Sequence, residues 1–268
     1  MDTFVSKEDL SSMQAGLNLY SIRNYLDTEE NFLKAALQLK EMGYSYIQYS
    51  GGAFDPERIA RVSARSGLPV VLTHVPMDRI INDTQALMEE HNKFGCKNIG
   101  LGAMPPADIA DEVKCKQMIE QLNRAGEIMQ QNGFAFFYHH HHFEFFKHGG
   151  QTVFDYIIEN APYINYTLDT YWLQYGGVDI GATIDRLKGR ICCVHLKDYM
   201  ISNSAESIGG FAPVFAPVGD GNIDFASLIP RMKESGAQYY LVEQDNAATL
   251  PDTMGQVERS IRYIQNHL

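Results

Sequence analysis

Short apolar segments alternate along the chain with longer segments whose apolar residues recur at helical spacing. The short segments are rich in β-branched and aromatic residues, which favour strands. Eight of them follow one another: Ala15–Ile22, Tyr44–Tyr49, Leu68–Val75, Lys97–Leu101, Phe134–Glu144, Ile164–Asp169, Ile191–Leu196 and Gln238–Glu243. The longest segment of the second kind, Ala107–Gln131, carries Ile109, Val113, Ile119, Leu122 and Ile128 along one stripe, which predicts a helix packed on one face.

Capping residues mark where several of the expected helices begin and end. Asp27 is followed three residues later by Glu30, and Asp55 precedes Pro56, which suits the first helical position. Gly43 is placed to end the first helix. The remaining helices are expected at Asp83–Phe94, Ala107–Gln131, Val153–Glu159, Asp179–Lys188, Asp224–Ser235 and Asp252–His267.

Eight strand–helix pairs with short connections predict an α/β protein, a (β/α)8 TIM barrel. We expect one catalytic domain over residues 15–268 after a loose lead-in over residues 1–14. A doubly wound open sheet is the structural competitor, but no GxGxxG follows the first strand and no P-loop motif occurs. The long connection Asp198–Gly221 is expected to form one wall of the pocket.

Composition narrows the class of partner. The chain has 268 residues, is 45% hydrophobic and carries a formal net charge of −11, which argues against a protein that binds a nucleic-acid backbone. No segment has the length of a membrane span, and the N-terminus lacks the pattern of a signal peptide. We therefore expect a cytoplasmic protein that acts on a small molecule, with a homo-oligomer left open. The four cysteines have no CxxC spacing and are expected to be reduced.

Three of the later strand segments end on residue types that bind metals. Asp169, His195 and Glu243 close the sixth, seventh and eighth segments. All strands of a parallel barrel open their C-terminal ends onto one face, where active sites lie. Carboxylate oxygens and an imidazole nitrogen suit Mn²⁺, Mg²⁺, Co²⁺ or Zn²⁺. The sequence therefore predicts a divalent-metal site, although each residue alone could also serve as a helix cap or an ion-pair partner.

The fifth segment, FAFFYHHHHFE, runs into four consecutive histidines. By strand alternation His139 and His141 share one face and His140 and His142 share the other. Glu144 lies just beyond, where the strand should turn into a loop. The residues leave the fourth metal ligand open between Glu144 and His139.

Other polar and aromatic residues lie near predicted strand ends. His74 ends the third segment and is a candidate for substrate contact, while Lys197 shares the face of His195 and could neutralise an oxyanion. Arg23 could hold a polar group of the substrate, and Tyr20 and Trp172 could stack on a sugar ring. Structural packing or solvent exposure would explain each of these residues as well.

Several of these stretches together resemble a known superfamily. They are LYSIR at 19–23, THVPMDR at 73–79, YHHHHFEF at 138–145, LDTYW at 168–172, VHLKD at 194–198, PVGDGNIDF at 217–225 and VEQD at 242–245. In this order they resemble the xylose-isomerase-like sugar phosphate isomerase/epimerase superfamily, in particular a subgroup with a YHNHxxEF signature. The resemblance implies a TIM barrel whose divalent metal is held by Glu144, Asp169, His195 and Glu243. A glutamate that relatives carry inside the fifth strand would align near His139.

A site of this kind supports removal of a proton beside a carbonyl, with the metal as Lewis acid and an enediolate as intermediate. Glu144 or Glu243 is the expected acid/base, with His141 as the other candidate and Lys197 supporting the oxyanion. His139 is a further candidate for substrate contact. The first expectation is a sugar isomerase or epimerase acting on a keto-sugar or related polyol.

The same chemistry allows alternatives. A lyase or dehydratase acting on a keto-inositol or a 3-keto-glycoside is the second expectation. An abasic-site endonuclease is third, and the net charge of −11 counts against it. A barrel that only binds sugar would lack a convergent metal site.

Overall fold

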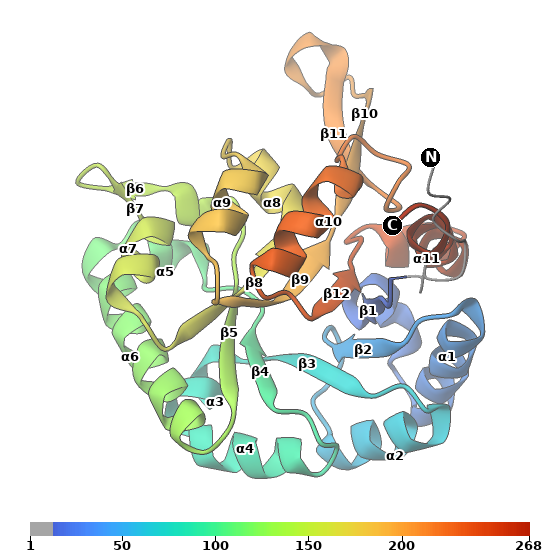
Figure 1. The fold of residues 1–268 in the computed structure, drawn as a ribbon, viewed down its shortest axis with the longest axis horizontal. Helices are drawn as coiled ribbons and strands as arrows, with labels where there is room; N and C mark the ends of the chain where they lie inside the picture. Colours follow the sequence, from blue (N-terminus) through green and yellow to red (C-terminus); the bar gives the residue numbers. More distant parts are fainter. Residues whose placement is uncertain (1–12) are drawn as a thin grey trace, which may run out of the picture.

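The computed structural model describes residues 13–268, so the lead-in predicted for residues 1–14 lies almost entirely outside the described part of the chain. Eight parallel strands close into a barrel in the order β1-β12-β9-β8-β5-β4-β3-β2, with helices around the outside (Figure 1). Their bounds are β1 Gly16–Asn18, β2 Tyr46–Tyr49, β3 Val70–Val75, β4 Asn98–Leu101, β5 Ala135–His139, β8 Ile164–Asp169, β9 Ile191–Leu196 and β12 Tyr239–Val242. The predicted single-domain (β/α)8 barrel is confirmed.

The surrounding helices are α1 Glu29–Met42, α2 Pro56–Ser66, α3 Met77–Asn82, α4 Thr84–Asn92, α5 Pro106–Ala110, α6 Glu112–Gln131, α7 Val153–Asn160, α8 Thr170–Tyr175, α9 Ile180–Arg186, α10 Phe225–Glu234 and α11 Thr253–His267. Side-chain caps fix several starts: Asp55 accepts from the Arg58 amide and Asp111 from the Lys114 amide. The helix predicted at Asp83–Phe94 agrees with α4, but the stretch predicted as one helix at Ala107–Gln131 is divided, since Asp111 separates α5 from α6.

Strand alternation builds a floor beneath the mouth of the barrel. A small buried apolar cluster contains Tyr46, Val71, Leu72, Phe137, Cys193 and Leu241. In β3, β5 and β9 a member of this cluster lies two residues before a histidine at the strand end, as Phe137 lies before His139. Because side chains two apart point the same way, the strands carry apolar groups inside the barrel and polar groups above them.

Gly16 in β1 shows how tightly the barrel interior is filled. A Cβ at this position would lie 2.2 Å from a ring carbon of Tyr46, closer than any real contact. The Tyr46 hydroxyl donates to the main-chain oxygen of Gln14 at 3.0 Å. A glycine is therefore needed where the Tyr46 ring crosses the barrel.

Two predicted strands end earlier than expected. The first, predicted to Ile22, ends at Asn18, whose side chain accepts from the Tyr20 amide and starts a 3-10 turn at Leu19–Tyr25. The fifth, predicted to run to Glu144, ends at His139 and is followed by a 3-10 turn at Phe143–Phe145. In both cases the chain turns at the mouth of the barrel, so the last strand residue faces the interior.

The long connection after β9 forms an antiparallel hairpin, β10 Asp198–Asn203 with β11 Phe211–Ala216, which projects beyond the barrel (Figure 1). A second short ribbon, β6 Lys147–His148 with β7 Gln151–Thr152, follows the turn at Phe143–Phe145. Buried Asp198 anchors the hairpin by accepting from the amides of Tyr199, Gly219, Gly221 and Ile223. Only the base of the hairpin packs near the barrel mouth, where the Phe215 ring lies 4.7 Å from Tyr171.

No helix in the described residues has both the length and the apolar character needed to cross a bilayer. Cys96, Cys115, Cys192 and Cys193 are all free, as expected, and three of them are buried.

Candidate metal centre and cavity

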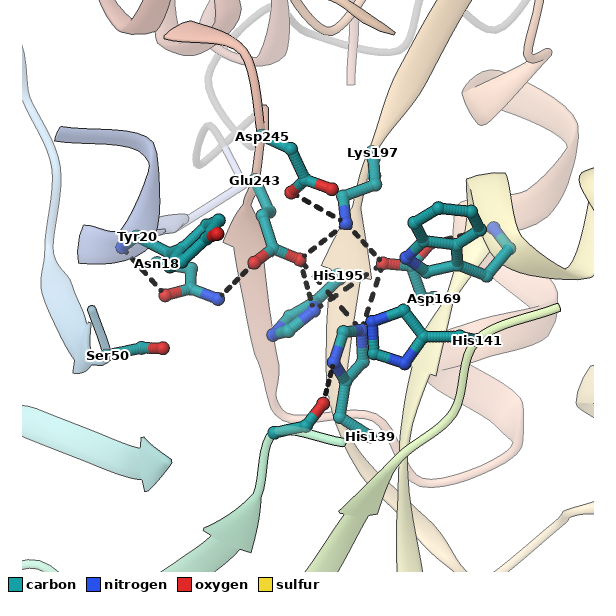
Figure 2. A network of polar contacts seen from close by, with 12 residues as sticks. Asn18, Tyr20, Ser50, His139, His141, Asp169, His195, Lys197, Glu243 and Asp245 are labelled. Carbon is teal, nitrogen blue, oxygen red and sulfur yellow. Dashed lines mark hydrogen bonds and ion pairs between the residues drawn. The ribbon is translucent and has the colours of Figure 1, made fainter. Parts of the chain in front are cut away.

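Four buried side chains from consecutive barrel strands meet at the C-terminal mouth of the barrel (Figure 2). They are His139, Asp169, His195 and Glu243, and one donor atom from each lies within 4.8 Å of the others. His139 Nε2 is 3.2 Å from Asp169 Oδ2 and 3.9 Å from Glu243 Oε2. His195 Nδ1 is 2.8 Å from Glu243 Oε2 and 3.6 Å from Asp169 Oδ2. The structure thus brings together Asp169, His195 and Glu243, the three residues singled out at strand ends.

The donor atoms fit a divalent cation. His195 Nδ1 and Glu243 Oε2 are buried and face each other at 2.8 Å. The far nitrogen of each imidazole faces an oxygen: His139 Nδ1 is 2.9 Å from the Gly102 carbonyl and His195 Nε2 is 2.7 Å from Gln48 Oε1. A histidine that donates through one nitrogen presents the lone pair of the other, which is the usual arrangement around protein-bound metals.

Lys197 places a positive charge against the same carboxylates. Its side chain is 1% exposed, and Nζ lies 3.0 Å from Glu243 Oε2, 3.3 Å from Asp169 Oδ2 and 3.0 Å from Asp245 Oδ1. Burial alone would lower the pKa of Lys197, but the three carboxylates together raise it above its usual range. Burial would raise the pKa of Asp169 and Glu243, yet Lys197 and the imidazoles hold both well below usual values. Both carboxylates are therefore ionised.

Glu144 lies outside this group. Its buried carboxylate accepts from the Tyr138 hydroxyl at 2.7 Å and from the His141 amide at 2.7 Å. Burial raises the pKa of Glu144 to about 7 in spite of these hydrogen bonds. The resemblance matched Glu144 to a metal position, but the geometry puts His139 there, because β5 ends at His139 and the turn at Phe143–Phe145 directs Glu144 back toward the strand.

A cavity of about 260 Å³ opens beside the four residues. It is lined by Tyr20, Ser50, His74, Gly102, Ala103, His139, His141, Lys197, Glu243 and Asp245. Its size suits one small molecule rather than a large ligand, since drug-sized pockets start at roughly 300 Å³. None of the residues of the connection Asp198–Gly221 is in this set, so the prediction that this connection walls the pocket is not supported by the lining.

Two histidines of the lining are uncharged. His74 stacks on His139 with ring centroids 5.3 Å apart, and its Nδ1 lies 3.3 Å from Ser50 Oγ. His141 stacks on Phe143 at 4.8 Å. Burial, reinforced by nearby positive groups, lowers the pKa of both histidines well below the usual range. Each therefore offers a neutral imidazole to a ligand, and His141 is a weaker base than expected.

The other predicted substrate contacts, Tyr20, Arg23 and Trp172, differ in their position relative to the cavity. Tyr20 lines the cavity and is 36% exposed. Arg23 is already engaged, since Nη1 donates to the carbonyls of Tyr20 and Asp245 and the guanidinium lies 4.2 Å from the Tyr20 ring centre. Trp172 lies one layer behind the cavity, with Lys197 Nζ 5.1 Å from its ring centre. Only Tyr20 of the three lines the cavity.

Three residues of the site were absent from the sequence-based set. Asn18 Nδ2 donates to Glu243 Oε1 at 2.6 Å, Gln48 holds His195, and Asp245 binds Lys197 and lines the cavity. Asn18 and Gln48 are fully buried amides in otherwise apolar strands. A polar residue in such a strand needs a buried partner, and this is the sequence feature that points to a role in the site.

A model of the xylose isomerase-like TIM barrel family matches residues 36–267. The chain belongs to this xylose isomerase-like family. No curated protein matches the chain.

Solved structures share the fold of this xylose isomerase-like chain over nearly its whole length. A sugar phosphate isomerase/epimerase from Parabacteroides distasonis ATCC 8503 is 20% identical, with 98% of this chain and 96% of that chain covered and a TM-score of 0.77. A probable 3-DHS dehydratase from Bacillus anthracis is 14% identical, with coverage of 96% and 100% and a TM-score of 0.70. A xylose isomerase-like TIM barrel protein from Mycobacterium smegmatis in complex with magnesium is 15% identical, with coverage of 94% and 95% and a TM-score of 0.68.

At these identities the structural matches establish the fold that the xylose isomerase-like chain shares with the three proteins. The YHNHxxEF subgroup is tested by none of them and stays a prediction.

Proposed function

We propose that this protein is a divalent-metal-dependent isomerase or epimerase that acts on a small keto-sugar or related polyol. The observation that carries the proposal is the convergence of His139, Asp169, His195 and Glu243 beside a cavity of about 260 Å³, whose lining includes His139 and Glu243. The mouth of a (β/α)8 barrel is where enzymes of this fold react. A single structural ion pair would not bring donor atoms of four side chains, from four different strand ends, within 4.8 Å of one another in a buried site.

The four residues would hold the metal, and each is supported from behind. Gly102 and Gln48 orient the two imidazoles, and Asn18 fixes the second oxygen of Glu243. When bound, a divalent ion acts as a Lewis acid that polarises a carbonyl and so makes the neighbouring C–H more acidic.

Glu243 and Asp245 are the groups best suited to move that proton. Both carboxylates line the cavity, and each lies 3.0 Å from the Lys197 ammonium. Burial, with Glu243 nearby, raises the pKa of Asp245 above its ordinary value against the opposing effect of Lys197. We assign proton abstraction and return to these two carboxylates. This replaces Glu144, which is turned toward Tyr138 and the His141 amide and is not in the cavity lining.

The rest of the lining would orient the substrate. Lys197 would stabilise negative charge on the substrate oxygen as the proton leaves. Ser50, His74 and His141 offer neutral donors and acceptors to hydroxyl groups, and the Tyr20 ring offers an apolar face.

We further propose that the substrate carries no phosphate. Among the residues that the structure describes, Lys197 is the one Lys or Arg that lines the cavity, and three carboxylates already surround it. Arg23 is tied to two main-chain carbonyls. A phosphate would meet Glu243 and Asp245 without a free cation to balance its charge.

A lyase or dehydratase that starts with the same proton removal is the second candidate. Asp245 favours it, because a cavity-facing carboxyl of raised pKa can protonate a departing hydroxyl or alkoxide. The endonuclease reading is disfavoured by the same acidic lining, which would repel a phosphodiester. The cytoplasmic location and the homo-oligomer stay predictions.

Solvent-isotope exchange tests the proposal. Unphosphorylated keto-sugars and a keto-inositol are incubated with the protein in deuterated water, with and without chelator, and the substrates are followed by NMR. Metal-dependent loss of the proton beside the carbonyl is expected, and product analysis separates rearrangement from loss of water. Absence of exchange across the panel with metal bound would count against the proposed chemistry, and exchange confined to sugar phosphates would overturn the assignment of substrate class.

A further inference from the structure

The donor set of the centre is half imidazole. Two of its four donors are ring nitrogens, from His139 and His195, and two are carboxylate oxygens, from Asp169 and Glu243. We infer that the centre selects a first-row transition ion such as Co²⁺, Fe²⁺ or Zn²⁺ over Mg²⁺. The inference rests on the proposed function and adds the identity of the ion class.

His139 is fixed as a nitrogen donor by its surroundings. The Gly102 carbonyl can only accept, so His139 Nδ1, 2.9 Å away, carries a hydrogen, and Nε2 is the ring nitrogen that faces Asp169 Oδ2 at 3.2 Å. The ring is held between neighbours, with centroids 5.3 Å from His74 and 4.6 Å from His141. Its side chain is 4% exposed. The imidazole is therefore already oriented for an ion.

His195 is fixed in the same way from the opposite side. Its Nε2 lies 2.7 Å from Gln48 Oε1, and its Nδ1 points at Glu243 Oε2. His195 Nδ1 and Glu243 Oε2 are both buried and lie 2.8 Å apart. A cation between His139, His195 and Glu243 would satisfy both atoms at once.

The chemistry of these donors discriminates between ions. Mg²⁺ takes oxygen ligands in near-ideal octahedral geometry and keeps several waters, whereas imidazole suits Fe, Co, Ni, Cu and Zn. A His-for-oxygen exchange at one ligand position therefore weakens binding of Mg²⁺ more than binding of Co²⁺ or Zn²⁺.

Lys197 strengthens this preference. Its ammonium lies 3.0 Å and 3.3 Å from the two carboxylate oxygens that face the centre. Two carboxylates and one ammonium give the set a formal charge of −1, so simple charge attraction to a divalent ion is reduced. Mg²⁺ gains little from nitrogen donors and depends most on charge attraction, so the Lys197 ammonium weakens its binding more than that of Co²⁺ or Zn²⁺.

Calorimetric titration of the full-length, chelator-treated protein with Mg²⁺, Mn²⁺, Co²⁺ and Zn²⁺ tests the inference. The expected affinities rise in that order, and Co²⁺ should bind at least about tenfold more tightly than Mg²⁺. Visible absorption of the Co²⁺ complex gives a second readout that does not depend on activity, because its bands report nitrogen ligation.

His139→Glu supplies the decisive comparison. It replaces the nitrogen donor by oxygen, so the ratio of Co²⁺ to Mg²⁺ affinity should fall by about tenfold or more. His142→Glu is the matched control, since His142 is in the same run but outside the four-residue set, and it should leave the ratio unchanged. If His139→Glu does not fold by circular dichroism, His139→Gln is used, which should lose affinity for Co²⁺ more than for Mg²⁺.

The outcomes separate the inference from the proposed function. Equal affinity of the wild-type protein for Mg²⁺ and Co²⁺, or an unchanged ratio in His139→Glu, overturns the selectivity and leaves metal-assisted chemistry standing. Absence of binding for every ion overturns both.

Discussion

The ammonium of Lys197 lies 3.0 Å from Oδ1 of Asp245 and 3.0 Å from Oε2 of Glu243, so one buried cation joins two cavity-lining carboxylates. Without a bound metal, this contact offsets the repulsion among the acidic groups at the barrel mouth. With a metal present, the same charge opposes the ion. Lys197 therefore acts on stability and on metal affinity in opposite directions.

Lys197→Met should destabilise the metal-free protein and strengthen metal binding. Removal of one partner of a buried ion pair costs about 3–5 kcal/mol, because the remaining charges are left uncompensated. The variant should also exchange the substrate proton more slowly, since no ammonium would remain near the oxyanion. Urea unfolding in chelator and calorimetric metal titration give the two readouts. A variant with unchanged stability and weaker metal binding would show that Lys197 has another role.

Asp245→Asn tests the assignment of proton transfer. Loss of a general acid or base lowers the exchange rate by about 10²–10⁴-fold. Metal affinity should change little, because Asp245 is outside the four-residue set. Asp220→Asn is a matched control: its ion pair with Arg259 is on the surface, and the rate should be unaffected. A full rate in Asp245→Asn would remove this carboxylate from the chemistry.

Metal affinity should rise with pH up to about 9. Burial alone would lower the pKa of His195, but the carboxylates of Glu243 and Asp169 raise it to about 9. Below that pH the imidazole is protonated in the metal-free protein, and an ion must displace the proton. We expect about a tenfold gain in affinity per pH unit between roughly pH 7 and 9, with release of about one proton per ion. Calorimetry in buffers of different ionisation enthalpy counts the protons, and a count near zero would contradict this assignment.

The buried carboxyl of Glu144 should make the protein less stable as pH rises. Burial raises its pKa in the folded protein from the ordinary 4.5 to about 7. A raised pKa means that the folded state binds the proton more strongly, so this stabilisation is complete below pH 4.5 and is lost as pH passes 7. The difference corresponds to at most about 3 kcal/mol. In Glu144→Gln this component should vanish, as measured by urea unfolding between pH 5 and 8; an identical pH profile in both proteins would exclude the effect.

The sequence predicted the barrel and three members of the centre because both depend on local pattern. Asp169, His195 and Glu243 each end a strand-length apolar segment. The C-terminal ends of all strands in a parallel barrel lie on the same face, so these three side chains are expected to lie on that face. The order of the strands then brought these residues together without further information.

The fourth member depended on where one strand ends. A resemblance matched Glu144, but the YHHHHFE stretch has no residue that marks where the strand ends and the turn begins. The structure ends β5 at His139 and turns Glu144 onto Tyr138. Asn18, Gln48 and Asp245 were missed because their roles arise from partners far away in the sequence.

The hairpin β10–β11 was missed for a similar reason. Neither Asp198–Asn203 nor Phe211–Ala216 alternates apolar with polar residues, and the glycines at 209 and 210 favoured a loop over the whole connection. Pairing between the two strands is a contact that neither strand predicts alone.

Anomalous diffraction from crystals of the protein loaded with Co²⁺ tests the central claim most directly. One peak is expected at the barrel mouth, coordinated by His139 Nε2, Asp169 Oδ2, His195 Nδ1 and Glu243 Oε2. A peak held by Glu144 in place of His139, or no peak at this mouth, would contradict the account.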